Sequence, residues 1–271
     1  MTTFEGQSAL ITGASSGIGA ALAREFARNG ANVALAARRV ERLARLAHEI
    51  EQTGRRAIAV HCDVTQDAEV EKAAAVTRDT FGRIDVVVAN AGFGVVGPVE
   101  RLTVDDYRRQ FETNVFGVVR TVRATLEDVK RTRGRIVVMG SVAGHIAAPG
   151  SSPYAMSKFA VRAFAEALGH ELVRAGVSVT LISPGYVASE IRRVDNDGTL
   201  REAASDPVPG WLIMPSARAA RQIVQAVARR RREAVTTGHA RAFVFLNRHA
   251  PWLVAAGIRR FGVKSRPEPR R

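Results

Sequence analysis

Short apolar runs alternate with amphipathic segments along the first two thirds of the chain. The runs are apolar at nearly every position instead of at every second one, which is typical of strands covered on both faces of a parallel sheet. We predict strands over residues 8–11, 33–37, 57–61, 86–90, 135–140 and 177–183.

The segments between these runs carry apolar side chains at the three- and four-residue spacing of a helix. The clearest covers residues 40–53 and ends at Gly54. We predict helices over residues 18–29, 40–53, 68–81, 105–131 and 154–175. The strand–helix alternation indicates an α/β fold, a Rossmann-type doubly wound parallel sheet in three α/β/α layers.

The alternation stops near Pro184, and no linker divides the chain before that point. We therefore predict a single domain over residues 1–239. Within it, residues 186–215 are rich in Asp, Gly and Pro and are predicted to form a substrate lid, because a loop of this length in a compact domain is usually functional. Residues 240–271 form a basic, apolar C-terminal extension.

Composition narrows the protein class. Of 271 residues, 46% are hydrophobic and 24% charged, an ordinary globular balance that excludes a disordered or collagen-like chain. The one cysteine, Cys62, excludes an internal disulfide framework and suits a reducing compartment. The chain starts without a signal-peptide pattern and has no long apolar run, so we expect a cytoplasmic protein.

The net charge of +14 is concentrated at the C-terminus. Residues 216–271 contain 14 basic and 2 acidic residues, which leaves only +2 on the rest of the chain. Trp, Phe and Leu alternate with the arginines, so the extension could lie peripherally on an anionic membrane surface. An equal alternative is packing on the body or on a neighbouring subunit. Nucleic acid is the weakest option, because no recognised binding motif accompanies the charge.

A glycine-rich turn links the first predicted strand to the first helix. It reads TGASSGIG from Thr12 to Gly19. Glycines allow a tight turn and close backbone approach, and the free N–H groups at a helix N-terminus bind a pyrophosphate. A purely structural turn is the alternative, but the strand before it and the helix after it favour a dinucleotide site.

The end of the second strand indicates which dinucleotide binds. A carboxylate there would accept hydrogen bonds from the ribose 2′-hydroxyl of NAD, but the chain has Arg38 and Arg39 instead. Guanidinium groups suit the 2′-phosphate of NADP, with Arg38 as the first ligand and Arg39 as the second. Solvated arginines are the alternative.

Four side chains could carry proton chemistry. Tyr154 and Lys158 lie four residues apart on one helix face, where an ammonium favours the phenolate. Ser141 ends the fifth strand, where its hydroxyl can reach a substrate oxygen. Asn114 lies inside a predicted helix, an unfavourable position unless its amide is used. Each could occur by chance, but together, behind a dinucleotide turn, they indicate a catalytic site.

These motifs resemble the short-chain dehydrogenase/reductase family over roughly residues 4–238. The matching residues follow the family's order and spacing: residues 12–19, Asp63, Val64, Asn90, Ala91, Gly92, Asn114, Ser141, Tyr154, Lys158, Pro184 and Gly185. The resemblance implies that Tyr154 is the general acid/base, that Ser141 polarises the carbonyl and that Lys158 lowers the pKa of the tyrosine. It also implies that Asn114 holds a water in a proton relay.

The resemblance further implies how the nucleotide lies. Asp63 would meet the adenine amino group beside Val64, and Asn90 would lie along the adenosine ribose. The full set of expected cofactor contacts is Gly13, Ser15, Ser16, Gly17, Ile18, Gly19, Arg38, Arg39, Asp63, Val64, Asn90, Ala91, Gly92, Tyr154, Lys158, Pro184, Gly185, Val187 and Ser189. Relatives that use NADP often carry a basic residue where this chain has Ser16, so the preference rests on Arg38 and Arg39.

The substrate pocket is expected at Phe93, His145, Tyr186 and Trp211. These walls are mostly apolar, and the sequence places no arginine or lysine over the reacting centre, which favours an apolar ketone, aldehyde or alcohol. We expect an NADP(H)-dependent oxidoreductase without a metal, and by resemblance a homodimer or homotetramer. The alternative is a non-catalytic dinucleotide-binding regulator or scaffold that acts through its basic tail.

Overall fold

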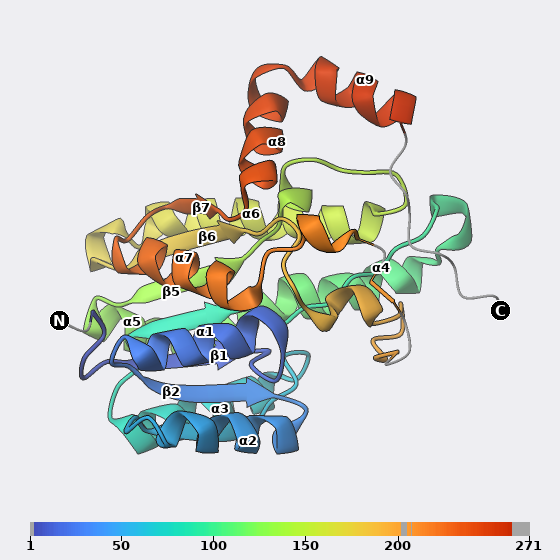
Figure 1. Ribbon diagram of the computed structural model, residues 1–271. Coiled ribbons are helices and arrows are strands. Elements are labelled where there is room, and N and C mark those ends of the chain that lie inside the picture. The colour runs from blue at the N-terminus through green and yellow to red at the C-terminus, as the bar shows by residue number, and fades with distance from the viewer. Residues whose placement is uncertain (1–2, 202–204, 207, 262–271) are drawn as a thin grey trace.

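Seven parallel strands form one sheet in the order β3-β2-β1-β4-β5-β6-β7 (Figure 1). The computed structural model describes residues 3–201, 205–206 and 208–261. Leu10 of β1 pairs with Ala34 of β2 on one side and with Val87 of β4 on the other. The strands are β1 (Ser8–Thr12), β2 (Asn32–Ala37), β3 (Ala57–His61), β4 (Val86–Ala89), β5 (Arg135–Met139), β6 (Ser178–Ser183) and β7 (Glu233–Val235).

Helices cover both faces of the sheet and bury a separate core on each. One core lies under α1 (Gly17–Arg28), α2 (Val40–Glu51) and α7 (Ser216–Ala228) and includes Leu22, Phe26, Leu43 and Ile223. The other lies under α3 (Asp67–Phe81), α5 (Gly117–Thr132) and α6 (Ser152–Glu171) and includes Val118, Val129, Val161 and Leu168. The predicted three-layer, doubly wound fold is confirmed.

The strand order reverses at β1, which lies between β2 and β4. At such a switch point the loops after neighbouring strands diverge to opposite faces, and a crevice opens at the carboxyl ends of the strands. The glycine turn after β1, residues 90–92 after β4 and Ser141 after β5 all follow these ends. The topology therefore brings the predicted site residues to one edge of the sheet.

The prediction of one helix over residues 105–131 was wrong. The structure has α4 (Val104–Phe111), a π-helical turn over Glu112–Phe116 and then α5. The wider turn contains Asn114, whose side-chain amide binds the backbone of Phe93, and precedes Gly117, where a Cβ would lie 2.7 Å from Val64 Cγ2. Such turns are frequent at functional sites. The sequence patterns also missed α7 and β7, which follow the lid.

The C-terminal helices stand out from the body. Figure 1 shows α8 (Gly238–His249) rising from the end of the sheet that carries β7, with α9 (Pro251–Phe261) across its far end. We call these two helices the arm. Ala240 is fully buried at the base of α8, and Asn247 Nδ2 donates to the backbone oxygen of His145 at 2.9 Å. The arm is thus attached to the body through one side of α8.

Candidate active site

The turn between β1 and α1 requires glycine. Gly13 and Gly17 have φ angles of +66° and +54°, a region that residues with a Cβ rarely adopt. A Cβ on Gly13 would lie 2.7 Å from Ala91 Cα, and one on Gly19 would collide with the carbonyl of Gly13. The backbone of the turn therefore packs directly against residues 90–91, and Ile18 follows within the first turn of α1.

Asn90 connects the ends of β1 and β4. Its side-chain amide donates to the backbone oxygens of Thr12 at 2.9 Å and Gly13 at 3.2 Å. The hydroxyl of Thr12 donates to Val88 and accepts from the backbone N–H groups of Asn90 and Ala91. The structure thus places Asn90 as a support of the glycine turn, a contact that the family resemblance had not implied.

Arg38 and Arg39 differ in their surroundings. Arg38 is exposed, and its guanidinium has no hydrogen-bond or ion-pair partner within the described part of the chain. Arg39 donates to Ser15 Oγ and, at 2.8 Å, to Ser16 Oγ, so it lies against the glycine turn. Both line a cavity of about 390 Å³ that also includes Arg42. Arg45 lines it as well, so four arginines and one carboxylate, that of Glu41, surround the cavity and leave it net positive, which suits an anion.

The other predicted cofactor contacts surround the same crevice. One carboxylate oxygen of Asp63 accepts from the backbone N–H and hydroxyl of Thr65 and orders the loop after β3. Val64 is buried beneath α5. After β6, Pro184 accepts from the backbone N–H of Val142, and Gly185 lies too close to Thr237 for any side chain. A Cβ on Gly17 would lie 2.9 Å from Ser189 Cβ, so the start of the lid lies on the glycine turn.

Tyr154, Ser141 and Lys158 come together at the end of β5. The ammonium of Lys158 lies 5.7 Å from the centre of the Tyr154 ring and donates to the backbone oxygen of Met139 at 2.8 Å. Burial lowers the pKa of Lys158 to about 8. Burial also raises the pKa of Tyr154, against the opposing effects of a hydrogen bond with Ser141 and of the positive charge of Arg192. The tyrosine is therefore a protonated phenol at neutral pH in this state.

Asn114 shapes the loop after β4. Its Oδ1 accepts from the backbone N–H of Phe93 at 3.1 Å, and its Nδ2 donates to the backbone oxygen of Phe93 and to Ser157 Oγ. Gln110 makes a second pair of bonds, to Phe93 and Val95. The two buried amides hold this loop near the tyrosine, and the ring of Tyr154 lies 3.6 Å from the position of a Cβ on Gly94.

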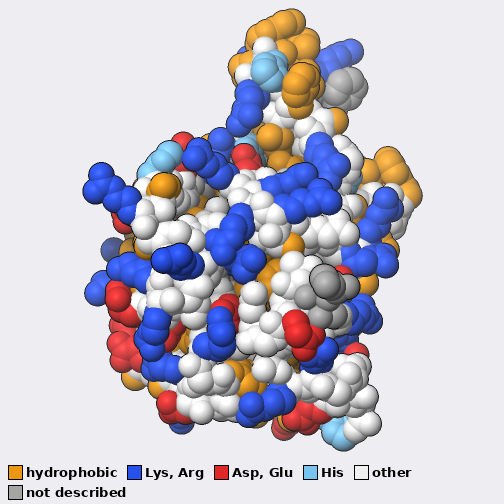
Figure 2. Space-filling view, turned by 90° about the vertical axis from the view of Figure 1, so that its left-hand side faces the viewer, with side chains coloured by type: hydrophobic (Ala, Val, Ile, Leu, Met, Phe, Trp, Pro, Cys, Tyr) orange, Lys and Arg blue, Asp and Glu red, His pale blue; other side chains and the backbone are white. Residues whose placement is uncertain are grey.

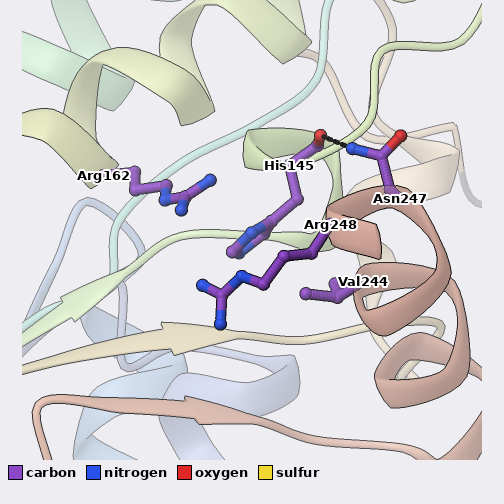
Figure 3. A pocket seen from close by; sticks show the side chains of 5 residues that line it. All are labelled: His145, Arg162, Val244, Asn247 and Arg248. Carbon is purple, nitrogen blue, oxygen red and sulfur yellow. Dashed lines mark hydrogen bonds between the residues drawn. The ribbon is translucent and has the colours of Figure 1, made fainter. Parts of the chain in front are cut away.

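The predicted pocket residues do not all meet at Tyr154. Tyr186 is half exposed and stacks on His239, with the Arg192 guanidinium over its ring, whereas Trp211 is 83% exposed. His145 is buried, with Nε2 at 2.9 Å from Ser183 Oγ and 3.2 Å from Glu233 Oε1. It lines a separate cavity of about 170 Å³ beside α8 together with Arg162, Val244, Asn247 and Arg248 (Figure 3).

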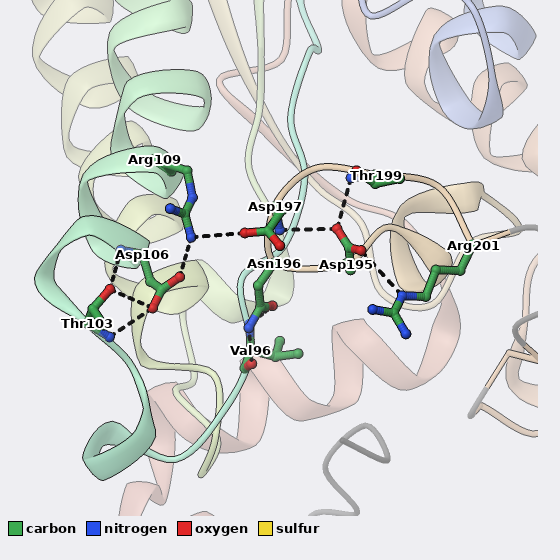
Figure 4. Close-up of polar contacts among 9 residues, drawn as sticks. All are labelled: Val96, Thr103, Asp106, Arg109, Asp195, Asn196, Asp197, Thr199 and Arg201. Atoms are coloured by element: carbon green, nitrogen blue, oxygen red, sulfur yellow. Dashed lines mark hydrogen bonds and ion pairs between the residues drawn. The ribbon is translucent and has the colours of Figure 1, made fainter. Parts of the chain in front are cut away.

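The lid is attached to the body at both ends of the crevice. Glu190 forms ion pairs of 2.9 Å with Arg39 and 2.8 Å with Arg42. At the other end, Asn196 exchanges hydrogen bonds with the backbone of Val96, and Asp197 lies 3.4 Å from Arg109 of α4 (Figure 4).

The lid also carries an internal pair, Arg192 with Asp206, at 2.6 Å. Sequence analysis missed Glu190, Arg42 and Arg192. Glu190 and Arg42 are 148 positions apart, and the charge of Arg192 acts on Tyr154, which belongs to another element, so neither interaction leaves a local pattern.

Comparison with known proteins agrees with this geometry. The model of the family described as short chain dehydrogenase matches residues 7–199. Oxidoreductase UcpA of Salmonella typhimurium is 41% identical over 202 residues, which cover 72% of this chain and 76% of that protein. The chain therefore belongs to the short-chain dehydrogenase/reductase family and is an oxidoreductase that acts on CH–OH groups.

Two solved structures share the fold. An alcohol dehydrogenase from Thermococcus sibiricus, complexed with 5-hydroxy-NADP, has a TM-score of 0.74 at 31% identity and covers 85% of this chain and 95% of its own. A short-chain dehydrogenase/reductase from Burkholderia phymatum, in complex with NAD, has a TM-score of 0.81 at 27% identity. That match covers 99% of this chain and 100% of the other. These neighbours bind nicotinamide nucleotides of both kinds.

Two further observations concern the described residues. They contain no group of three or more His, Cys, Asp or Glu side chains arranged to hold a metal ion. None of their helices combines the length and the apolar character needed to cross a membrane.

The contacts of Asn90 lead to a stability prediction. Asn90→Ala removes two hydrogen bonds to the carbonyls of Thr12 and Gly13, and we expect it to lower the free energy of unfolding by about 1–3 kcal/mol. The measurement is urea unfolding without nucleotide. Arg38→Ala, at an exposed position, should leave this value unchanged. Equal stabilities of the Asn90 variant and the wild type would contradict the supporting role of Asn90. Its expected contact with the nucleotide would then be its remaining role.

Proposed function

We propose that the protein is an NADP(H)-dependent oxidoreductase that interconverts an apolar ketone or aldehyde and the corresponding alcohol by hydride transfer. The observation that carries the proposal is the grouping of Ser141, Tyr154 and Lys158 at the edge of the sheet that also holds the glycine turn and Arg38. A non-catalytic regulator would have no need of this grouping, and nothing favours that alternative.

The glycine turn and the arginines fit a dinucleotide. The glycines at positions 13, 17 and 19 leave the backbone of the turn open to a pyrophosphate, and the N-terminus of α1 offers N–H groups. Four arginines line the neighbouring cavity, which is the proposed site of a 2′-phosphate. A bound nicotinamide would accept or supply the hydride. Arg38 and Arg39 would hold the phosphate, and Lys158 the nicotinamide ribose.

Side chains of the protein supply the proton that carbonyl reduction requires. The raised pKa of Tyr154 keeps its hydroxyl protonated, so that it can donate a proton to the carbonyl oxygen during reduction. Ser141 donates a hydrogen bond to the same oxygen and polarises the carbonyl. Lys158, with a pKa lowered to about 8, stabilises the tyrosinate that forms. In alcohol oxidation the same groups act in reverse.

The substrate is proposed to be apolar. The charge of Arg192 acts on Tyr154, contrary to the expectation that no arginine lies near the reacting centre, but Asp206 pairs with it at 2.6 Å. Phe93, on the loop that Asn114 holds, is a partly exposed aromatic side chain and contributes apolar surface there. This pairing offsets the charge of Arg192, which favours an apolar substrate over an anionic one.

We infer a homodimer through α5 and α6, which could pair further into a tetramer. Phe116, Met156 and Phe159 are large apolar side chains that remain exposed on the π-helical turn before α5 and on α6. Burying them against a second copy would remove apolar surface from water.

The catalytic role of Tyr154 gives a kinetic prediction. Tyr154→Phe removes the proton donor, and we expect turnover of a panel of apolar ketones and aldehydes to fall by about 10²–10⁴-fold. Binding of NADPH, followed by the change in its fluorescence, should stay within about twofold because the hydroxyl is used in chemistry. Turnover equal to that of the wild type, with NADPH bound, would exclude the assigned role.

Cofactor preference gives a binding prediction. Arg38→Ala removes an unpaired guanidinium from the proposed phosphate site, so NADPH should bind about tenfold more weakly or worse, whereas NADH should bind almost as before. Titration calorimetry with both nucleotides measures this. Arg28→Ala, an exposed arginine in the last turn of α1 and so at the opposite end of that helix from the glycine turn, serves as the matched control. Equal losses for NADPH and NADH would argue against recognition of the phosphate.

The arm suits an anionic lipid surface, and we propose this as a second property of the protein. Phe243, Phe245 and Trp252 are 53%, 65% and 67% exposed, so they do not pack on the body. Residues 238–261 contain four arginines and no acidic residue. Figure 2 shows apolar side chains at the tip of the projecting arm, with basic side chains beside them. Apolar anchors combined with positive charge are typical of interfacial helices.

Vesicle co-sedimentation tests the arm. Full-length protein should sediment with phosphatidylglycerol vesicles and not with phosphatidylcholine vesicles, and Phe245→Ser together with Trp252→Ser should weaken binding about tenfold or more. Trp211→Ser removes an exposed tryptophan outside the arm and should leave binding unchanged. If no vesicles bind and the double variant instead disrupts an oligomer, the arm is a subunit interface.

A further inference from the structure

Glu190 of the lid forms ion pairs with two of the arginines that line the proposed phosphate site. Its Oε2 lies 2.9 Å from Arg39 Nη1 and its Oε1 lies 2.8 Å from Arg42 Nη1. The same Arg39 reaches Ser15 and Ser16 of the glycine turn. A carboxylate from the lid therefore bridges two of the four arginines that line the anion cavity. We call Arg39, Arg42 and Glu190 the clasp.

The clasp is ionised and partly shielded from solvent. The Glu190 side chain is 20% exposed, and those of Arg39 and Arg42 are 39% and 31% exposed. Burial alone would raise the pKa of the Glu190 carboxyl, but hydrogen bonds from Arg42 and Arg39 lower it to about 2. Its negative charge thus persists at any pH at which the protein would be assayed, and protonation does not open the clasp.

The backbone beside Glu190 reinforces this placement. Ser189 lies on the glycine turn, with its Cβ 2.9 Å from the position of a Cβ on Gly17. Val187, two residues earlier, is buried and pairs with Met214 at the other end of the lid. The first residues of the lid are therefore held against the cofactor crevice, and Glu190 is directed to the end of β2, where α2 begins.

We propose that Glu190 is a specificity-determining residue that competes with the 2′-phosphate of NADP for Arg39 and Arg42. The proposal rests on the proposed function. Both anions need the same guanidinium donors, so binding of NADPH breaks the clasp and transfers its arginines to the phosphate. NADH brings no such anion, and Glu190 keeps its two partners. The lid carboxylate thereby lowers the affinity for NADPH and leaves that for NADH nearly unchanged.

The test compares Glu190→Gln with the wild type by titration calorimetry with NADPH and NADH. The glutamine keeps the shape of the side chain and removes its charge, so NADPH should bind about tenfold more tightly, the order of one charge-assisted hydrogen bond. NADH should change by less than about threefold. Glu49→Gln is the matched control, since it breaks another Arg–Glu pair, with Arg24 at 2.7 Å between α1 and α2, away from the crevice.

Unchanged or weaker NADPH binding in Glu190→Gln would overturn the competition. Equal tightening of NADPH and NADH would also overturn it, because Glu190 would then restrain the lid without discriminating the phosphate. The readout is the change in the ratio of the two affinities, so it is valid whichever nucleotide the wild type prefers. If the wild type prefers NADH, the proposed NADP(H) dependence is wrong, but the change in the ratio still tests the role of Glu190. Thermal unfolding of both variants without nucleotide verifies that they fold.

Discussion

The close contact between the glycine turn and residues 90–91 is the constraint on which the site depends. Gly13 approaches Ala91 so closely that a single added carbon has no space, and the Asn90 amide bridges the gap with two hydrogen bonds. This contact joins the ends of β1 and β4 at the switch point of the sheet. The crevice at the carboxyl ends of the strands has a defined shape because these two ends cannot move independently.

Burial provides the second constraint, because it alters the protonation of the catalytic pair. The buried ammonium of Lys158 donates to the backbone oxygen of Met139. Because burial removes it from water and disfavours the charged form, its pKa is lowered to about 8. The same burial favours the neutral phenol of Tyr154. The two side chains share one face of α6, so the helix determines their separation while the surrounding core determines their pKa values. Neither effect alone would produce a proton donor of this kind.

The lid and the arm are attached by surface contacts, whereas the core is held together by buried apolar packing. Ionic contacts attach residues 186–215 to Arg39 through Glu190 and to Arg109 of α4 through Asp197. Exposed or half-exposed ion pairs are individually weak, so a ligand that offers a better partner can replace them. The arm buries little of its apolar surface on the body. Both features belong to the surface of the protein.

Local pattern alone determined much of this protein. Continuous apolar runs and the spacing within residues 40–53 predicted the layers, and the glycine turn and the Tyr154–Lys158 pair identified the family, because these signals lie within a few neighbouring residues. The patterns did not predict the π-helical turn around Asn114, since the wider turn depends on the distant backbone of Phe93.

Only the tertiary structure brought Glu190 to Arg39 and Arg42, gave His145 its contact with Ser183 and let the charge of Arg192 act on Tyr154. Such contacts join residues that are far apart in sequence. Their existence depends on how the sheet folds the chain and not on any local propensity.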